Sequence, residues 1–141
     1  MPVLAREPGT QVFRELDEHP GDEQFAEVTV LRLDGGLFFA TADALEDRVR
    51  EVAPGSIAIV LDCGGMDFID SQGSAKMSEI LNLTRQAGVT LRVARLKPPV
   101  REVLERDGVL GRIGDDKIHG NIDHAVNAQL AVNRDHRADR E

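Results

Sequence analysis

The sequence has 141 residues, of which 41% are hydrophobic and 30% are charged; this composition fits one soluble globular domain and is too apolar for wholesale disorder. The 25 acidic and 17 basic residues give a formal net charge of −8, which disfavours a non-specific nucleic-acid binder because such proteins present a basic face. The five Phe are accompanied by no Trp or Tyr, so no stacking platform for bases is visible. The single cysteine, Cys63, excludes an internal disulfide framework and a multi-cysteine metal site.

The sequence shows no segment that would target it to a membrane or for secretion. No stretch approaches the roughly 20 apolar residues needed to cross a bilayer. Residues 1–10 include Arg6 and Glu7 and lack the apolar core of a secretory signal. These features predict a chain that is soluble and suited to a reducing cytoplasm.

The first third of the chain predicts an arm followed by strands. Prolines and glycines interrupt residues 1–26, and the short apolar alternation at residues 11–16 predicts one edge strand. Residues 27–33 alternate with aliphatic side chains on both faces, which predicts a strand covered on both sides. Asp34-Gly35-Gly36 is typical of a turn, and residues 37–40 predict a second short strand.

The central part predicts alternating helices and strands. Thr41 is a good N-cap for a helix whose apolar stripe recurs at helical spacing until Pro54-Gly55. Residues 56–62 form a continuous apolar run that predicts a buried central parallel strand, followed by a loop at residues 63–67. A second helix follows residues 70–73 and ends at Gly88.

The last part continues the alternation. Residues 90–94 predict another strand, and Pro98-Pro99 opens a third helix that ends at Gly108. The glycine-rich stretch to Gly114 predicts a wide turn, residues 117–119 a short strand, and Asn121 the cap of a final helix. Residues 133–141 are mostly charged and predict a solvated tail.

Repeated strand–helix units predict an α/β fold in which helices pack on one sheet. We expect an N-terminal arm at residues 1–26, a domain core at residues 27–132 and the C-terminal tail at residues 133–141.

The sequence gives little support for an enzyme or a metal site. It contains neither a phosphate-binding G-x-x-x-x-G-K-[ST] loop nor a G-x-G-x-x-G turn after a strand. A nucleophilic Cys63, assisted by Asp62 or Asp70, is a minor hypothesis, since a free cysteine is more often a small buried hydrophobe. His119 and His124 flank a helix start, and a two-ligand metal site there is disfavoured, so we expect no metal.

The segment Asp70-Ser71-Gln72-Gly73 lies where a helix begins, and its first backbone N–H groups favour negative charge. A phosphate on Ser71 would be stabilised there. The simpler interpretation is that Asp70 or Ser71 only caps the helix.

A basic cluster follows the next strand and predicts a surface for anions. In this acidic chain, the cluster brings together Arg92, Arg95, Lys97 and Arg101. Ligands of open α/β sheets bind beyond the carboxyl ends of the strands, where Thr41, Ser71 and the Arg95/Lys97 pair would lie. A small anion or a nucleotide phosphate could be bound there by helix N-termini and basic side chains.

Four segments, in chain order and spanning almost the whole chain, resemble one family. Residues 6–10 (REPGT) look like the segment by which its domain leaves a membrane part, and residues 31–42 (LRLDGGLFFATA) are similar to its R-x-D-x-x-L-F-F-A-N-A entry to the first helix. Residues 69–73 (IDSQG) fall on its D-x-[ST]-G loop, and residues 91–102 (LRVARLKPPVRE) resemble its L-x-x-A-x-x-K-x-P-V-R-E stretch. The chain thus resembles a STAS domain, in particular the cytoplasmic one at the C-terminal end of SulP-type sulfate/anion transporters.

This resemblance implies a mixed, mostly parallel sheet of four to five strands with helices mainly on one side, and no enzymatic activity. It implies a regulatory domain at the cytoplasmic face of the plasma membrane, whose partner is the transmembrane part of the same transporter. It also implies a guanine or adenine nucleotide, such as GTP or GDP, as a ligand. The candidate residues for binding this nucleotide or another anion are Thr41, Asp70, Ser71, Gly73, Arg95 and Lys97.

Soluble relatives within the resemblance suggest an alternative. In bacterial anti-sigma-factor antagonists, the Ser after the loop Asp is phosphorylated to switch binding of a protein partner, and Ser71 falls on that position. Gln72 departs from the pattern, because SulP loops usually have Thr or Ser there. The alternative function is a freestanding phospho-switch with Ser71 as the acceptor.

Overall fold

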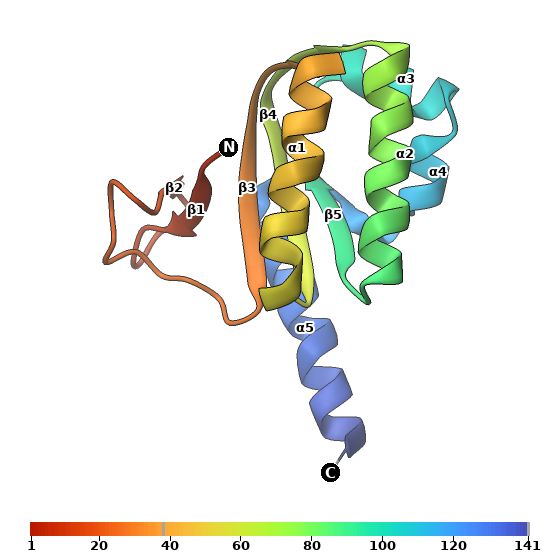
Figure 1. Ribbon diagram of the computed structural model, residues 1–141. Helices are drawn as coiled ribbons and strands as arrows, with labels where there is room; N and C mark the ends of the chain where they lie inside the picture. The colour runs from red at the N-terminus through yellow and green to blue at the C-terminus, as the bar shows by residue number, and fades with distance from the viewer. Residues whose placement is uncertain (38, 141) are drawn as a thin grey trace.

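A mixed sheet lies between two layers of helices in the computed structural model, which describes residues 1–37 and 39–140 (Figure 1). In the described part of the chain the sheet has six strands in the order β2-β1-β3-β4-β5-β6. Their bounds are β1 Val3–Arg6, β2 Phe13–Glu15, β3 Val28–Leu37, β4 Ala58–Ile69, β5 Thr90–Ala94 and β6 Ile118–His119. The α/β class is confirmed, and the sheet is slightly larger than the four to five strands expected.

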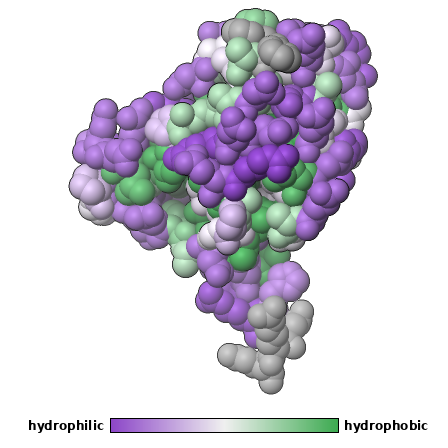
Figure 2. Space-filling model, in the orientation of Figure 1, coloured by the Kyte–Doolittle hydropathy of each residue, from purple (hydrophilic) through white to green (hydrophobic). Residues whose placement is uncertain are grey.

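The helices follow the strands in the order that the sequence predicts. They are α1 (Phe39–Val52), α2 (Ser71–Gln86), α3 (Pro98–Arg106), α4 (Val109–Ile113) and α5 (Ile122–Arg140), with 3₁₀ turns η1 (Ala53–Gly55) and η2 (Asp115–Lys117). Helices α1 and α2 cover one face of the sheet, whereas α5 crosses the other face and projects beyond it (Figure 1). The outer surface of α1 and α2 is mainly hydrophilic (Figure 2), as expected for helices with one apolar stripe.

The four strands β3 to β6 are parallel, so their carboxyl ends share one edge of the sheet. The N-terminal arm adds two antiparallel strands rather than the single edge strand expected, with β1 paired to both β2 and β3. Arg6 fastens this arm to the body of the domain, because its guanidinium lies 2.9 Å from a Glu23 carboxylate oxygen and 2.8 Å from one of Asp123 on α5.

Strands β3 and β4 are longer than predicted. The predicted turn at residues 34–36 and loop at residues 63–67 are both strand, and the two segments pair with each other through Asp34↔Gly65 and Gly35↔Met66. Two register shifts interrupt this pairing. The predicted short strand at residues 37–40 is therefore wrong: Leu37 ends β3, α1 begins at Phe39, and residue 38 lies outside the described residues.

Two predictions near the C-terminus also need correction. The predicted wide turn before Gly114 contains the short helix α4, which buries Val109, Leu110 and Ile113. The final helix is longer than predicted: the side chains at residues 134–138 are exposed, as expected for a solvated tail, but this segment continues α5 as far as Arg140.

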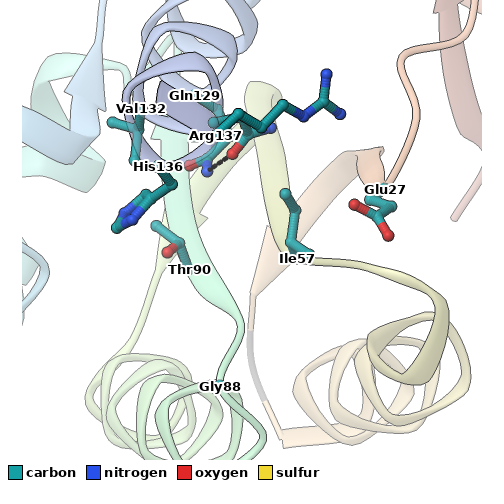
Figure 3. Close-up of a pocket in the computed structure, with 9 residues that line it drawn as sticks. Glu27, Ile57, Gly88, Thr90, Gln129, Val132, His136 and Arg137 are labelled. Atoms are coloured by element: carbon teal, nitrogen blue, oxygen red, sulfur yellow. Dashed lines mark hydrogen bonds between the residues drawn. The ribbon is translucent and has the colours of Figure 1, made fainter. Parts of the chain in front are cut away.

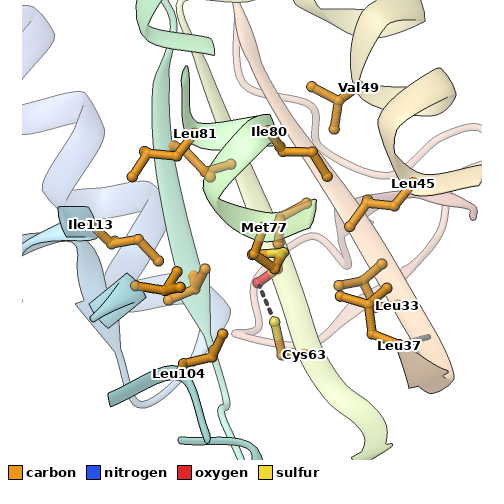
Figure 4. Packing of buried hydrophobic residues seen from close by; sticks show 14 of the residues in the cluster. Leu33, Leu37, Leu45, Val49, Cys63, Met77, Ile80, Leu81, Leu104 and Ile113 are labelled. Carbon is orange, nitrogen blue, oxygen red and sulfur yellow. Dashed lines mark hydrogen bonds between the residues drawn. The ribbon is translucent and has the colours of Figure 1, made fainter. Parts of the chain in front are cut away.

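Two apolar clusters fill the space on the two faces of the sheet. The larger one packs α1, α2, α3 and α4 against the sheet and includes Leu45, Leu61, Met77 and Ile80 (Figure 4). The smaller one lies under α5 and includes Val126 against Val60. Burial on both faces explains why the first part of β4, residues 58–61, is continuously apolar in the sequence.

Candidate functional site

Three helices begin at the carboxyl edge of the sheet, as the sequence predicts. Helices α1, α2 and α3 start just after β3, β4 and β5, respectively, and their first turns lie at the same end of the domain (Figure 1). This arrangement brings the helix starts that carry Thr41, Ser71 and Lys97 to one edge. We call this region the carboxyl edge.

Asp70 caps α2. Its side-chain Oδ1 accepts a hydrogen bond from the backbone N–H of Gly73 at 2.8 Å, and its backbone is extended. The capping interpretation of Asp70 is confirmed, so Ser71 is free of that role and occupies the first helical position with an exposed side chain. Any negative group on Ser71 would stand beside the positive end of the helix dipole.

Gly73 permits α2 to start close to the end of β3. A Cβ atom on Gly73 would lie 2.2 Å from the Leu37 carbonyl oxygen and 2.9 Å from Cγ1 of Ile69. The Asp70 backbone N–H also donates to the Leu37 carbonyl, at 3.3 Å. Gly73 thus contributes to the carboxyl edge because its lack of a side chain lets the backbones of α2 and β3 approach closely.

Thr41 does not cap α1, contrary to the prediction, because the helix begins two residues earlier at Phe39. Its hydroxyl donates a hydrogen bond to the carbonyl oxygen of Gly36 at 2.8 Å, which ties the start of the helix to the end of β3. The Thr41 side chain is thus a structural link across the β3–α1 connection.

Arg95 covers a buried carboxylate at this edge. Its Nη1 lies 3.3 Å from both carboxylate oxygens of Asp62, whose side chain is only 1% exposed, and Gly64 N donates to Asp62 Oδ1 at 3.1 Å. A Cβ on Gly64 would lie 2.4 Å from the guanidinium carbon, so Arg95 rests directly on the glycine. Arg95 also has a φ of 61°, a left-handed conformation that is rare for arginine.

Lys97 is paired as well. Its Nζ lies 3.0 Å from Oδ1 of Asp67, and both side chains are well exposed. The predicted basic surface is therefore a set of ion pairs, in which Asp62 and Asp67 partly neutralise Arg95 and Lys97. An anion that binds there must compete with these two carboxylates. Sequence reasoning missed Asp67, and its only signal was its proximity to the glycine-rich segment.

Arg92 does not belong to the predicted basic cluster. It is 4% exposed and donates to Gln129 Oε1 at 2.9 Å, while its Nη1 lies 3.0 Å from the Asp116 carbonyl oxygen and 3.1 Å from Nε2 of His119. These contacts fasten η2, β6 and α5 to β5. Burial lowers the pKa of His119, and the positive charge of Arg92 acts in the same direction.

The alternative chemistries find no support at Cys63 or His119. Cys63 lies in the core, where its thiol contacts the carbonyl of Leu61 (Figure 4). Burial raises the pKa of this thiol to about 12, and the charge of Asp62 adds to the shift, so the reactive thiolate is not formed near neutral pH. Among the residues that the structure describes, no three His, Cys, Asp or Glu side chains gather closely enough to hold a metal ion.

Comparison with known proteins assigns the family. Residues 17–129 match the family model described as STAS domain. The chain belongs to the STAS domain family. It is 24% identical over 136 residues to high affinity sulfate transporter 2 of Stylosanthes hamata, a match that covers 88% of this chain and 20% of the relative. The chain thus spans about a fifth of the length of this curated relative.

Solved structures agree on the fold. The murine solute carrier 26 family member A9 anion transporter matches with a TM-score of 0.80 at 17% identity, covering 92% of this chain and 22% of that one. The unphosphorylated anti-sigma factor antagonist SpoIIAA matches with a TM-score of 0.64 at 15% identity, covering 78% and 94%. In the described part of this STAS domain, no helix has the length and hydropathy of a membrane span.

Proposed function

We propose that this STAS domain is the non-catalytic cytoplasmic regulatory domain of a SulP-family sulfate or anion transporter, whose transmembrane part moves the anion. The observation that carries the proposal is the family match over residues 17–129 together with a relative, named a sulfate transporter, in which such a domain occupies about a fifth of the length. The N-terminal arm, fastened to α5 through Arg6, is then the segment that joins the domain to the membrane part.

The coding sequence immediately upstream of Met1 tests this proposal. We expect the same reading frame to encode about ten transmembrane helices before this domain, each recognisable as a run of roughly 20 apolar residues. A reading frame that truly starts at Met1 would contradict the transporter proposal and favour a freestanding protein.

We further propose that the carboxyl edge binds a nucleotide such as GTP or GDP through its phosphates. Support comes from the start of α2 at exposed Ser71 and from the nearby Arg95 and Lys97. Since both basic side chains already face carboxylates, we expect weak binding that decreases with salt.

An NMR titration with GTP and GDP tests the nucleotide ligand. Binding should shift backbone amides in residues 35–42, 63–73 and 95–99, and Lys97→Gln should weaken it. Arg106→Gln removes an exposed, carboxylate-paired cation from the last turn of α3, away from the carboxyl edge, and should leave binding unchanged. Shifts confined to other residues, or none at millimolar nucleotide, would remove this ligand.

A second candidate function is the phospho-switch, in which phosphorylated Ser71 changes the binding of a protein partner. Its support is the likeness in fold to an anti-sigma factor antagonist and the exposed position of Ser71 at the start of α2. Mass spectrometry of the protein isolated from its own cells should then find phosphate on Ser71. Failure to detect phosphate on Ser71 under any growth condition would argue against the switch.

A further inference from the structure

A hollow lies at the opposite end of the sheet from the carboxyl edge. The later turns of α5 pass the amino-terminal ends of the central strands and leave a cavity of about 380 Å³ (Figure 3). This volume falls in the range of small-molecule sites, roughly 300–1,000 Å³. Its lining combines Ile57, just before β4, and Thr90, the first residue of β5, with residues of α5.

A buried amide side chain, that of Gln129, lines this hollow and forms hydrogen bonds with its neighbours. Gln129 is 4% exposed, its Oε1 accepts from Arg92, and its Nε2 donates to Oδ1 of Asn133 at 2.9 Å. Because the oxygen of Asn133 is already used, its amide N–H groups remain as donors in the lining. Ile57 and Val132, the latter 38% exposed, supply apolar surface beside them.

Unpartnered positive charge gathers at the same place. Among the basic residues whose side chains the structure describes, all but Arg101, Arg134 and Arg137 have a carboxylate, carbonyl or amide partner. Arg137 lines the hollow, and Arg134 and Arg137 both line an adjoining one of about 300 Å³ that shares Asn133. In a chain of net charge −8, this clustering of free cations is unusual. Glu27 supplies the one carboxylate of the lining.

We propose that this hollow binds a small organic anion, namely a carboxylate that carries a short apolar body. The carboxylate lies against Arg137 and the amide of Asn133, and the apolar body packs on Ile57 and Val132. Glu27 faces the same space (Figure 3), so its charge opposes an anion and limits the affinity. The proposal is independent of the transporter assignment and of any ligand at the carboxyl edge.

Titration of the 141-residue chain with three probes, followed by backbone amide NMR, tests the ligand class. Hexanoate combines charge and apolar body, hexylammonium reverses the charge, and inorganic sulfate lacks the apolar body. We expect hexanoate at up to roughly 20 mM to shift amides at residues 27, 57, 88–90 and 129–137, and the other two probes to shift them less. Equal or larger shifts with hexylammonium, equal shifts with sulfate, or no shift at these residues would overturn the proposal.

Variants that remove a single charge from the hollow test the proposal by the direction in which the affinity for hexanoate changes. Arg137→Gln should weaken hexanoate binding about two- to fivefold, as expected for a solvent-accessible ion pair, and Glu27→Gln should strengthen it about twofold. Arg101→Gln removes an equally unpartnered cation far along the chain on α3 and is the matched control, with no expected change. Unchanged affinity in both hollow variants, or the opposite signs, would refute the assignment. All three side chains are exposed, so folding should survive, and the amide spectrum verifies it.

Discussion

Replacement of Gly73 by alanine separates two opposing effects at the carboxyl edge. In a helix, alanine is favoured over glycine by about 1 kcal/mol, so helix propensity alone predicts a more stable protein. However, the added Cβ would lie 2.2 Å from the carbonyl oxygen of Leu37, whereas a tolerable carbon–oxygen contact is about 3.3 Å or longer. Relief requires movement of backbone by about 1 Å, because the obstructing atom is not a flexible side chain. Overpacking costs about 1–3 kcal/mol, and the upper part of this range applies because the backbone must move. After the gain of about 1 kcal/mol in helix propensity, we expect a net loss of roughly 1–2 kcal/mol.

Urea unfolding followed by far-UV circular dichroism measures this loss, and Gly111→Ala in α4 is the matched control. A Cβ on Gly111 would meet nothing within 4 Å, so this variant should gain up to about 1 kcal/mol. The reasoning is refuted if Gly73→Ala is as stable as the wild type or shares the gain of the control. That result would mean that α2 does not start in close contact with the end of β3.

Three further predictions concern the cap, the thiol and a histidine. Asp70→Ala should lower the free energy of unfolding by about 1 kcal/mol, and Asp70→Asn should retain most of it; equal losses in urea unfolding would argue against the cap. Cys63 should resist a disulfide-exchange reagent at pH 8 in the native protein and react quickly in denaturant, because its pKa is raised to about 12 in the core; rapid native labelling would contradict its burial. The pKa of His119 lies below its ordinary value of 6.5 when the protein is folded, because the folded protein favours the neutral imidazole. The folded state is therefore more stable relative to the unfolded state above pH 6.5, and it loses this stability as the pH falls. The unfolding free energy should therefore decline from pH 7.5 to 5 more steeply in the wild type than in His119→Gln, and parallel slopes would exclude this cause.

Local sequence signals predicted the elements that depend on local physics. Asp70 as a cap, Pro98 at the start of α3 and Asn121 before α5, where its Oδ1 accepts from His124 N at 2.8 Å, all reflect hydrogen bonds within one turn. Residues 90–94 were predicted as a strand with the observed bounds, between Gly88, which ends a helix, and Pro98-Pro99, which opens the next.

Non-local pairing explains what the sequence did not predict. Gly64 and Gly65 are typical of a loop, yet they continue β4 because β3 offers partners as far as Leu37. Gly111 lies in a helix because its neighbours Val109, Leu110 and Ile113 bury against the core. At the candidate site, the sequence indicated the shared edge of three helix starts, since parallel strands end together. The pairing of Arg95 with Asp62 depends on the register between β4 and β5, which one sequence does not reveal.

The initial rate of sulfate uptake by cells expressing the complete reading frame tests the regulatory proposal most directly. The comparison is between the intact protein and a Ser71→Ala/Lys97→Gln double variant, with Arg106→Gln in the last turn of α3 as the control and equal membrane abundance verified for all three. We expect uptake by the intact protein and the control, and a changed rate in the double variant because the carboxyl edge is altered. Identical rates in all three, or no uptake by the intact protein, would contradict a regulatory role of this edge in sulfate transport.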